Sequence, residues 1–398
     1  MATANPLPDA ASPTATPDTR LLVLLASLPQ EQLTSVLGKL AACVAPENLL
    51  IATSDETVKT VRPDLHIVTA ATTKSTWTIT AADYVSAFQL AQENHAHAVL
   101  LLGPECDSLS ERGLRNLASA IMADGSDLAM PLYDLPPRAG LVNSAILYPL
   151  SRALFASAVR FPLAVDLGMS MRMAERISMA AQRFTNLNQP TAILWPVNEA
   201  SAAGFTISEV EAGARILPQP SEPDLNTVLP LVAGSLFADI EAKAAFWQRA
   251  RQMPLERNHQ PALAASAADN PTDIAPMLQA FRVAYTNLQE IWSLVLPPNS
   301  LLGLKRLSLM DGTAFRMPES LWARIVFDFV LAYRLRTINR GHLLGALIPL
   351  YLAWVASHIN VSATETGPDH HIEAVAAAFA TEKPYLVARW RWPDRFNP

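Results

Sequence analysis

The stretch AVLLLGPECDS, residues 98–108, decides the fold. Five consecutive apolar residues that stop at Gly103-Pro104 are typical of a strand buried on both faces of a sheet. The polar residues that follow such a strand stand where open α/β sheets bind their ligands, outside the carboxyl ends of the strands. The stretch therefore predicts a central strand with a candidate site directly after it.

The residues around this stretch alternate between short apolar runs and helical patterns. Strands are expected at 21–28, 49–53, 66–70 and 127–133, with helices between them. Ser108 and Glu111 make a capping box that would open the helix after the central strand. Strand–helix alternation predicts an open parallel sheet with helices on both faces. Its ligand site should lie at the strand ends, which are Ser27, Ser54, Ala70 and residues 103–107.

The character of the chain changes after Pro218. Helices are expected at 225–252, 277–296, 319–337, 342–358 and 371–380, and the alanine- and proline-rich residues 253–276 read as a connector. We therefore expect a disordered tail over 1–19, an α/β domain over 20–220 and an all-helical C-terminal domain over 221–398.

Composition limits the class of protein. Half of the 398 residues are hydrophobic and 17% are charged, which excludes a wholly disordered chain. The net charge of −6 predicts no global attraction to nucleic acid or anionic lipid. The two cysteines exclude a disulfide scaffold or a structural zinc site and fit a cytoplasmic protein. Prolines (31) outnumber glycines (14), which disfavours a glycine-rich loop that holds phosphate.

Two segments raise the question of a membrane. Residues 343–361 are apolar and long enough to be considered as a span, but Pro349 and the arginines before them favour a buried helix without a transmembrane span. The run RWRW at 389–392 could make peripheral membrane contact or stack on bases, or its tryptophans could dock on the domain.

Four residues could carry chemistry, and three of them also have a structural reading. Glu105 and Asp107 offer the hard oxygen ligands that Mg²⁺ or Mn²⁺ prefers, or else Asp107 caps the next helix. Asp166 lies among apolar residues, where burial could raise its pKa and make it a base; alternatively it caps a helix that begins near Met169. Asn143 could donate to a sugar hydroxyl or cap the helix over 144–155. His370, His371 and Glu373 resemble a metal cluster, but adjacent helical side chains point apart.

Several motifs resemble those of a known family. NSAILYPLSRALF at 143–155, VRFP at 159–162 and LAVDLGMS at 163–170 are similar to the N-S-x-x-x-Y-P-L-x-R-x-L-F/Y, V-R-x-P and G-G-D-F-G-L/M-S elements of bacterial GT-A glycosyltransferases. That group is family-2-like and similar to mannosylglycerate synthase. WARIVFDF at 322–329 and the stretch 344–357 resemble the helical tail of the same group.

The resemblance implies a GT-A-like (Rossmann-like) sheet followed by helices, and transfer of a sugar from a nucleotide-sugar donor to a small or lipid-linked acceptor. It places Glu105, Asp107 and Trp195 at the donor, with Glu105 as the ligand of a Mg²⁺ or Mn²⁺ ion. It places Asn143, Asp166 and Gly168 at the acceptor, with Asp166 as the catalytic residue.

The chain departs from the family pattern at the metal site. Gly103 stands where the family has the first acid of D-x-D, and Ala164 and Val165 replace two glycines. Leu194 and Leu217 fall where an aspartate and a metal-binding histidine are expected. Each lost charged ligand removes a large Coulomb attraction for the metal. Two hypotheses follow, a glycosyltransferase and a non-catalytic binding or assembly subunit that keeps the fold.

Overall fold

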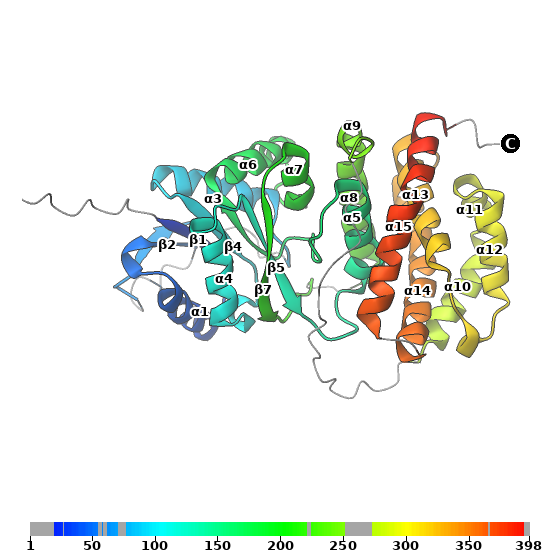
Figure 1. Ribbon diagram of the computed structural model, residues 1–398, viewed down its shortest axis with the longest axis horizontal. Coiled ribbons are helices and arrows are strands. Elements are labelled where there is room, and N and C mark those ends of the chain that lie inside the picture. Colours follow the sequence, from blue (N-terminus) through cyan, green and yellow to red (C-terminus); the bar gives the residue numbers. More distant parts are fainter. Residues whose placement is uncertain are drawn as a thin grey trace, which may run out of the picture.

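The computed structural model describes residues 20–26, 28–54, 58, 62–70, 77–220, 224–250, 273–364 and 367–393. The predicted tail at 1–19, Ser27 and most of the connector lie outside the described residues. Figure 1 shows a layered sheet region joined to a helical region. The sheet has the strand order β3-β2-β1-β4-β6-β5-β7. Its strands are β1 (Leu21–Leu25), β2 (Leu49–Thr53), β3 (His66–Thr69), β4 (Ala98–Leu102), β5 (Leu128–Asp134), β6 (Asp166–Ser170) and β7 (Ile207–Ala214).

The strand directions determine which residues meet. β1 pairs in parallel with β2 and β4, and β5 pairs in parallel with β7, but β6 runs antiparallel to both β4 and β5. The open sheet is confirmed, whereas the expectation of an all-parallel sheet is wrong for β6. The start of β6 therefore lies opposite the end of β4, with Asp166 paired to Leu102.

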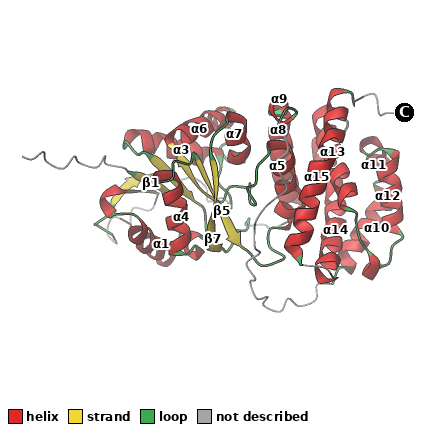
Figure 2. Cartoon of the chain, viewed as in Figure 1, coloured by secondary structure: helices red, strands yellow, loops and turns green. Residues whose placement is uncertain are grey.

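Helices cover both faces of the sheet, as predicted (Figure 2). α1 (Gln30–Cys43) and α4 (Glu111–Met122) pack on one face, while α3 (Ala81–Glu93), α6 (Met171–Asn186) and α7 (Pro196–Ala203) pack on the other. β4 divides its side chains between them, with Leu100 in the first core and Leu101 in the second. Because each fully buried leucine contributes about 1.5–3 kcal/mol, this five-residue strand stabilises both layers.

Two predicted caps are wrong. Ser110, not Ser108, caps α4, because its hydroxyl accepts from the backbone N–H of Gly113 at 3.0 Å. Asp166 opens a strand, and the cap of α6 is Ser170.

The helical region contains α8 (Leu225–Ala242), α9 (Ala244–Trp247), α10 (Ala275–Asn287), α11 (Gln289–Val295), α12 (Pro298–Ser308), α13 (Glu319–Leu335), α14 (Arg340–Thr364) and α15 (Pro368–Arg391). The helix predicted over 277–296 is divided between α10 and α11. α12 was not expected, and α15 continues through Pro384 far beyond the predicted 371–380. At its end Trp390 is buried against Trp247, while Trp392 is 63% exposed.

α14 includes the apolar stretch 343–361 and is a buried helix, as predicted. α8 and α14 both have the length and apolar composition of a membrane span, and 72% of the apolar window of α14 is buried within the molecule. α14 packs against α8, α10, α13 and α15, which accounts for its apolar surface on several sides.

One helix of the helical region comes from the middle of the sheet sequence. After β5 the chain forms a π-helical turn (Asn143–Leu147) and α5 (Tyr148–Phe155), and then returns as β6. All eight residues of α5 are buried, and the helix packs against α15. The Trp322 indole N–H donates to the carbonyl oxygen of Ala145 at 2.8 Å, which joins α13 to this turn. The excursion also explains why β6 enters the sheet from the end at which β5 leaves it.

Candidate functional site

The candidate site lies where β4 ends. Since β4, β5 and β7 share one direction and β6 opposes them, the ends of β4 and β7 and the start of β6 lie at one edge of the sheet. After β4 the chain turns through Glu105, whose φ of 58° is left-handed, into a 3-10 turn over Cys106–Ser108. Ser54 and Ala70 follow β2 and β3 at the same edge. The strand ends at which the sequence predicts a site therefore lie at one edge of the sheet, with Ser27 outside the described residues.

Gly103 permits a close approach between β4 and β6. A Cβ atom at this position would lie 2.6 Å from the carbonyl oxygen of Val165, which is closer than packed atoms approach. The backbone N–H of Gly103 also donates to that oxygen at 3.0 Å. The sheet geometry therefore leaves no room for a side chain at position 103.

Asp166 is fully buried at this edge and its carboxylate is saturated with donors. Oδ1 accepts from the Gly103 backbone N–H at 3.1 Å and from Arg215 Nη2 at 3.2 Å. Oδ2 accepts from the Tyr133 hydroxyl at 2.7 Å and from Arg215 Nε at 2.8 Å. A carboxylate has about four lone-pair sites, so these four hydrogen bonds fill them.

Arg215 follows β7, and its side chain is completely buried. Besides Asp166, its guanidinium donates to four oxygens of the surrounding loops, the carbonyls of Pro104 (2.7 Å), Glu105 and Ile216 (2.8 Å) and the Ser108 hydroxyl (3.1 Å). A guanidinium carries five N–H donors, and the six contacts occupy all of them. No donor of Arg215 is left for a ligand.

The surroundings of this cluster raise the pKa of Arg215 and the pKa of Tyr133. Burial lowers the pKa of Arg215, but the Asp166 carboxylate outweighs burial and holds that pKa above its ordinary value. Burial, and then the charge of Asp166, raises the pKa of Tyr133 well above its usual range. Asp166 and Arg215 thus form a buried ion pair to which a neutral tyrosine donates. Sequence reasoning missed Arg215; the one signal is a lone arginine between the apolar residues Ala214 and Ile216.

Glu105 and Asp107 lie half-buried on the loop itself. Lys39 of α1 holds this loop, because its ammonium donates to the carbonyl oxygens of Asp107 at 2.5 Å and Leu109 at 2.9 Å. Asp107 Oδ1 is buried and has no hydrogen-bond partner among the described residues. Asp107 does not cap α4, because Ser110 is its N-cap.

The other predicted residues have packing partners of their own. Asn143 lies inside the π-helical turn and donates from Nδ2 to the carbonyl oxygen of Arg160 at 2.8 Å, so it is not a helix cap. Gly168 faces α4, where a Cβ would lie 2.9 Å from Ile121. Trp195 is 2% exposed and belongs to the core of the helical region. The structure brings together only Asp166 and the 103–108 loop.

The implied divalent metal does not fit these residues. Glu105 is the ligand that the resemblance implies, and Asp166, which lies beside the loop of Glu105, is already paired with the Arg215 guanidinium. A divalent ion about 4 Å from that guanidinium would be repelled by about 4 kcal/mol per unit charge at an effective dielectric constant of 20. Within the part of the chain that the structure describes, no three His, Cys, Asp or Glu side chains are grouped to hold a metal.

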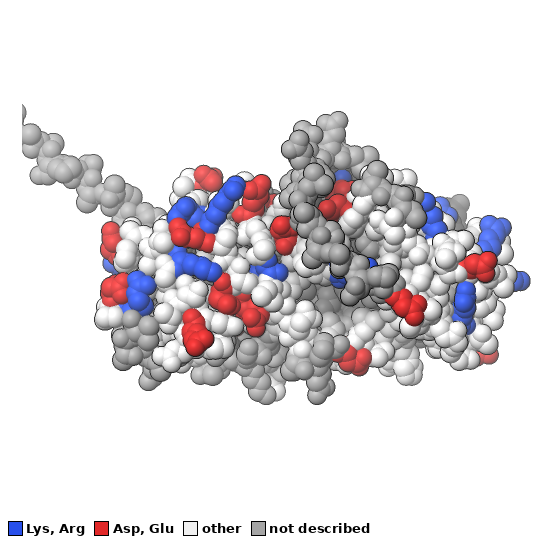
Figure 3. All heavy atoms as spheres, turned by 90° about the horizontal axis from the view of Figure 1, so that it is seen from below, with Lys and Arg blue, Asp and Glu red and all other residues white. Residues whose placement is uncertain are grey.

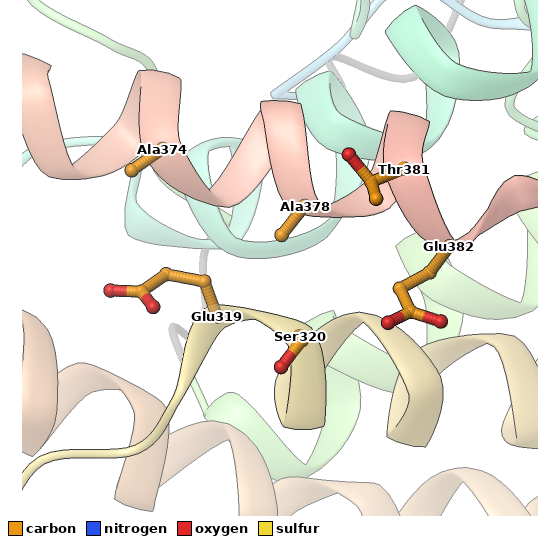
Figure 4. A pocket seen from close by; sticks show the side chains of 6 residues that line it. All are labelled: Glu319, Ser320, Ala374, Ala378, Thr381 and Glu382. Carbon is orange, nitrogen blue, oxygen red and sulfur yellow. The ribbon is translucent and has the colours of Figure 1, made fainter.

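A surface groove lies in the helical region, away from this edge (Figure 4). It has a volume of about 260 Å³ and is lined by Glu319 and Ser320 of α13 and by Ala374, Ala378, Thr381 and Glu382 of α15. Glu382 is paired with Arg324 at 2.9 Å, and Glu319 lies 3.5 Å from Arg316. The acids of the groove therefore already have basic neighbours.

Charged side chains are mixed on the molecular surface. On the face in Figure 3, basic and acidic side chains of the described residues are interspersed over both regions.

Comparisons with known proteins give similarity at the level of structure. No family model matches the chain, and no curated protein matches it. Glucosyl-3-phosphoglycerate synthase from Mycobacterium tuberculosis in complex with phosphoglyceric acid aligns with a TM-score of 0.36 and 12% identity over 56% of this chain and 79% of that one. The same enzyme with Mn²⁺, UDP and glucosyl-3-phosphoglycerate aligns with a TM-score of 0.35 and 14% identity over 56% and 80%. A mycobacterial protein aligns with a TM-score of 0.36 and 13% identity over 56% and 74%.

Proposed function

We propose that this chain is a glycosyltransferase-like protein that does not transfer sugar through a metal-dependent site, and that it serves as a binding or assembly subunit. The motifs at 143–155 and 159–170 support the relation to glycosyltransferases. One observation carries the loss of the metal-dependent reaction, namely the fully buried ion pair between Asp166 and Arg215.

Asp166 lacks the access that a catalytic base needs. A general base must come within hydrogen-bonding distance of the proton that it removes. The Asp166 carboxylate has no exposed surface, and its lone pairs are taken by Gly103, Tyr133 and Arg215. An acceptor hydroxyl could reach it only after this network had broken.

Arg215 is equally unsuited to replace a metal at the donor diphosphate. Stabilising a leaving diphosphate requires donors aimed at the position where negative charge develops. Every donor of the Arg215 guanidinium is directed at an oxygen of the protein. The charge therefore serves the loop structure and is not available to a substrate.

A second candidate, sugar transfer without a metal, is favoured by one feature. Glu105 and Asp107 are half-buried acids at the carboxyl end of the central strand, which is where open α/β sheets bind ligands. In this reading, Glu105 or Asp107 would contact the sugar of the nucleotide donor, and Asp166 would only shape the loop.

The test uses the purified full chain with UDP- and GDP-sugars, with and without Mn²⁺, followed by calorimetry and by release of UDP or GDP. We expect no Mn²⁺-dependent binding and no nucleotide release above the buffer rate; donor binding without release would support a binding role. Mn²⁺-dependent turnover would overturn the proposal. Metal-independent turnover that Glu105→Gln or Asp107→Asn abolishes would establish the second candidate instead.

A further inference from the structure

We propose that the edge of the sheet forms a cation site built for a guanidinium group, which Arg215 fills from within and from which a divalent metal is excluded. This inference deepens the proposed function and rests on it, because it gives a reason why no divalent metal is held beside Asp166. It concerns a binding site made of oxygens, whose resident ligand is a side chain of the same protein.

The site is a cage of oxygens from three separate segments. Its wall consists of the two carboxylate oxygens of Asp166, the carbonyl oxygens of Pro104, Glu105 and Ile216, and the hydroxyl of Ser108. These belong to the loop after β4, the start of β6 and the end of β7. The fold thus brings Pro104 of the cage to Arg215, which lies 111 positions away in the chain.

Other contacts fix the cage wall. The carbonyl oxygen of Glu105 also accepts from the Ser108 backbone N–H at 3.0 Å and from its hydroxyl at 2.6 Å. The Ser108 hydroxyl in turn accepts from the backbone N–H of Ile216 at 3.0 Å. Glu105 holds the left-handed conformation, which costs an L-residue roughly 1–2 kcal/mol. We infer that the cage contacts compensate for this conformation.

Both charge and shape favour a guanidinium. The cage contains one carboxylate, that of Asp166, so a monovalent cation neutralises it and a divalent ion would leave a buried positive charge without a partner. Mg²⁺ and Ca²⁺ are bound by six or more oxygens around a point, whereas these oxygens accept from the separate N–H groups of a planar fork. Tyr133 adds a hydroxyl donor to Asp166, which further lowers the negative potential available to a metal.

The experiment removes the resident group and offers replacements. In Arg215→Ala the cage loses its cation, and we expect the midpoint of thermal unfolding to fall by roughly 4–6 °C, as a broken buried pair predicts for a chain of this size. Millimolar methylguanidinium should restore part of this loss. Urea, which has the shape without the charge, and Mn²⁺, which has the charge without the shape, should not.

A matched variant separates this effect from the loss of any arginine. Arg112 pairs with Glu211 of β7, the strand that Arg215 follows, but the side chains of this pair are 77% and 70% exposed. Arg112→Ala should change the midpoint little and should show no rescue by methylguanidinium. In the double variant Asp166→Asn, Arg215→Ala the rescue should disappear, since the cage then has no carboxylate.

Several outcomes would overturn the inference. The first is a thermal midpoint for Arg215→Ala that equals that of Arg112→Ala. The second is that methylguanidinium stabilises Arg215→Ala and wild type equally. The third is that Mn²⁺, and not methylguanidinium, stabilises Arg215→Ala. If Arg215→Ala does not fold, the inference is tested with Arg215→Lys and with the wild type. We expect Arg215→Lys to unfold at a lower temperature than wild type, and Mn²⁺ binding to wild type that Asp166→Asn removes would refute the cage. These readouts measure stability and binding, so turnover by wild type would refute the proposed function separately.

Discussion

The sheet region and the helical region each contain a buried cluster of an aspartate, an arginine and a tyrosine. The two clusters differ in how many of their hydrogen-bond donors and acceptors have partners. In the sheet region, Asp166 and Arg215 use every acceptor and donor. In the helical region, Asp328 of α13 accepts from Tyr385 and Arg389 of α15 through Oδ1 alone. Asp328 Oδ2 and Arg389 Nε are buried without a hydrogen-bond partner among the described residues.

The difference shows that burial alone does not decide what an ion pair does. The loops around Arg215 supply four additional oxygens and fix its charge, whereas two packed helices supply few polar groups. Burial raises the pKa of Asp328 to about 7, although Arg389, Tyr385 and Arg324 act to lower it. The sheet cluster stabilises the loops around it, whereas Asp328 of the helical cluster titrates near neutral pH.

The largest effect should come from breaking the sheet cluster. Asp166→Ala leaves the Arg215 guanidinium buried without a counter-ion, and we expect a loss of about 3–5 kcal/mol in the free energy of unfolding. Urea denaturation at neutral pH measures it. Exposed Asp311→Ala is the control; an equally small loss for both variants would show that the pair does not stabilise the fold.

The helical cluster should respond to pH instead. A carboxyl whose folded-state pKa is about 7, against a reference value of 3.8, stabilises the fold at low pH, and this stability is lost as the pH rises toward 7. Relative to wild type, Asp328→Asn should therefore gain about 2–3 kcal/mol between pH 5 and pH 7. Urea denaturation at both pH values tests this, and Asp311→Asn should show no such gain. A difference between Asp328→Asn and wild type that does not vary with pH would contradict the assignment.

Substitution of Gly103 tests how closely the sheet cluster is packed. Gly103→Ala would place a Cβ 2.6 Å from the carbonyl oxygen of Val165, and we expect it to cost about 1–3 kcal/mol. At Gly38 of α1 a Cβ meets nothing within 4 Å, so Gly38→Ala should stabilise by up to about 1 kcal/mol. The two midpoints in urea should move in opposite directions; a shift of the same sign would show that β4 and β6 can separate at little cost.

The smallest expected effect concerns a buried histidine of the helical region. His358 is buried with its Nδ1 2.7 Å from Nδ1 of His371. Burial first, and then the charges of His371 and Arg160, lower the pKa of His358 to about 3 from 6.5. Stability is therefore present above pH 6.5 and is lost as the pH falls, by about 1 kcal/mol at pH 5.5. His358→Gln should lose this dependence, whereas Gln at the exposed His342 should keep it.

The sequence predicted best those elements that local patterns define. β2 and β4 have the predicted bounds, because a buried apolar run between turns leaves little choice of register. β6 was missed because the segment Asp166–Ser170 is short and lies next to a helix. Its antiparallel direction results from the excursion of the chain through α5. The Asp166–Arg215 pair joins residues 49 positions apart, and nothing near either residue indicates the other. The family resemblance placed Asp166 at the acceptor, and its contact with Gly103 follows from the pairing of β4 with β6.

The excursion through α5 has a consequence for synthesis of the chain. Arg152 of α5 and its partner Glu373 of α15 are 221 residues apart. At roughly 5–20 residues per second, the ribosome needs roughly 10–45 s to make the chain between them. Throughout that interval α5, whose residues are all buried in the finished protein, lacks its contacts with α15. The nascent chain should therefore be a client of chaperones that bind apolar helices until α15 has left the exit tunnel.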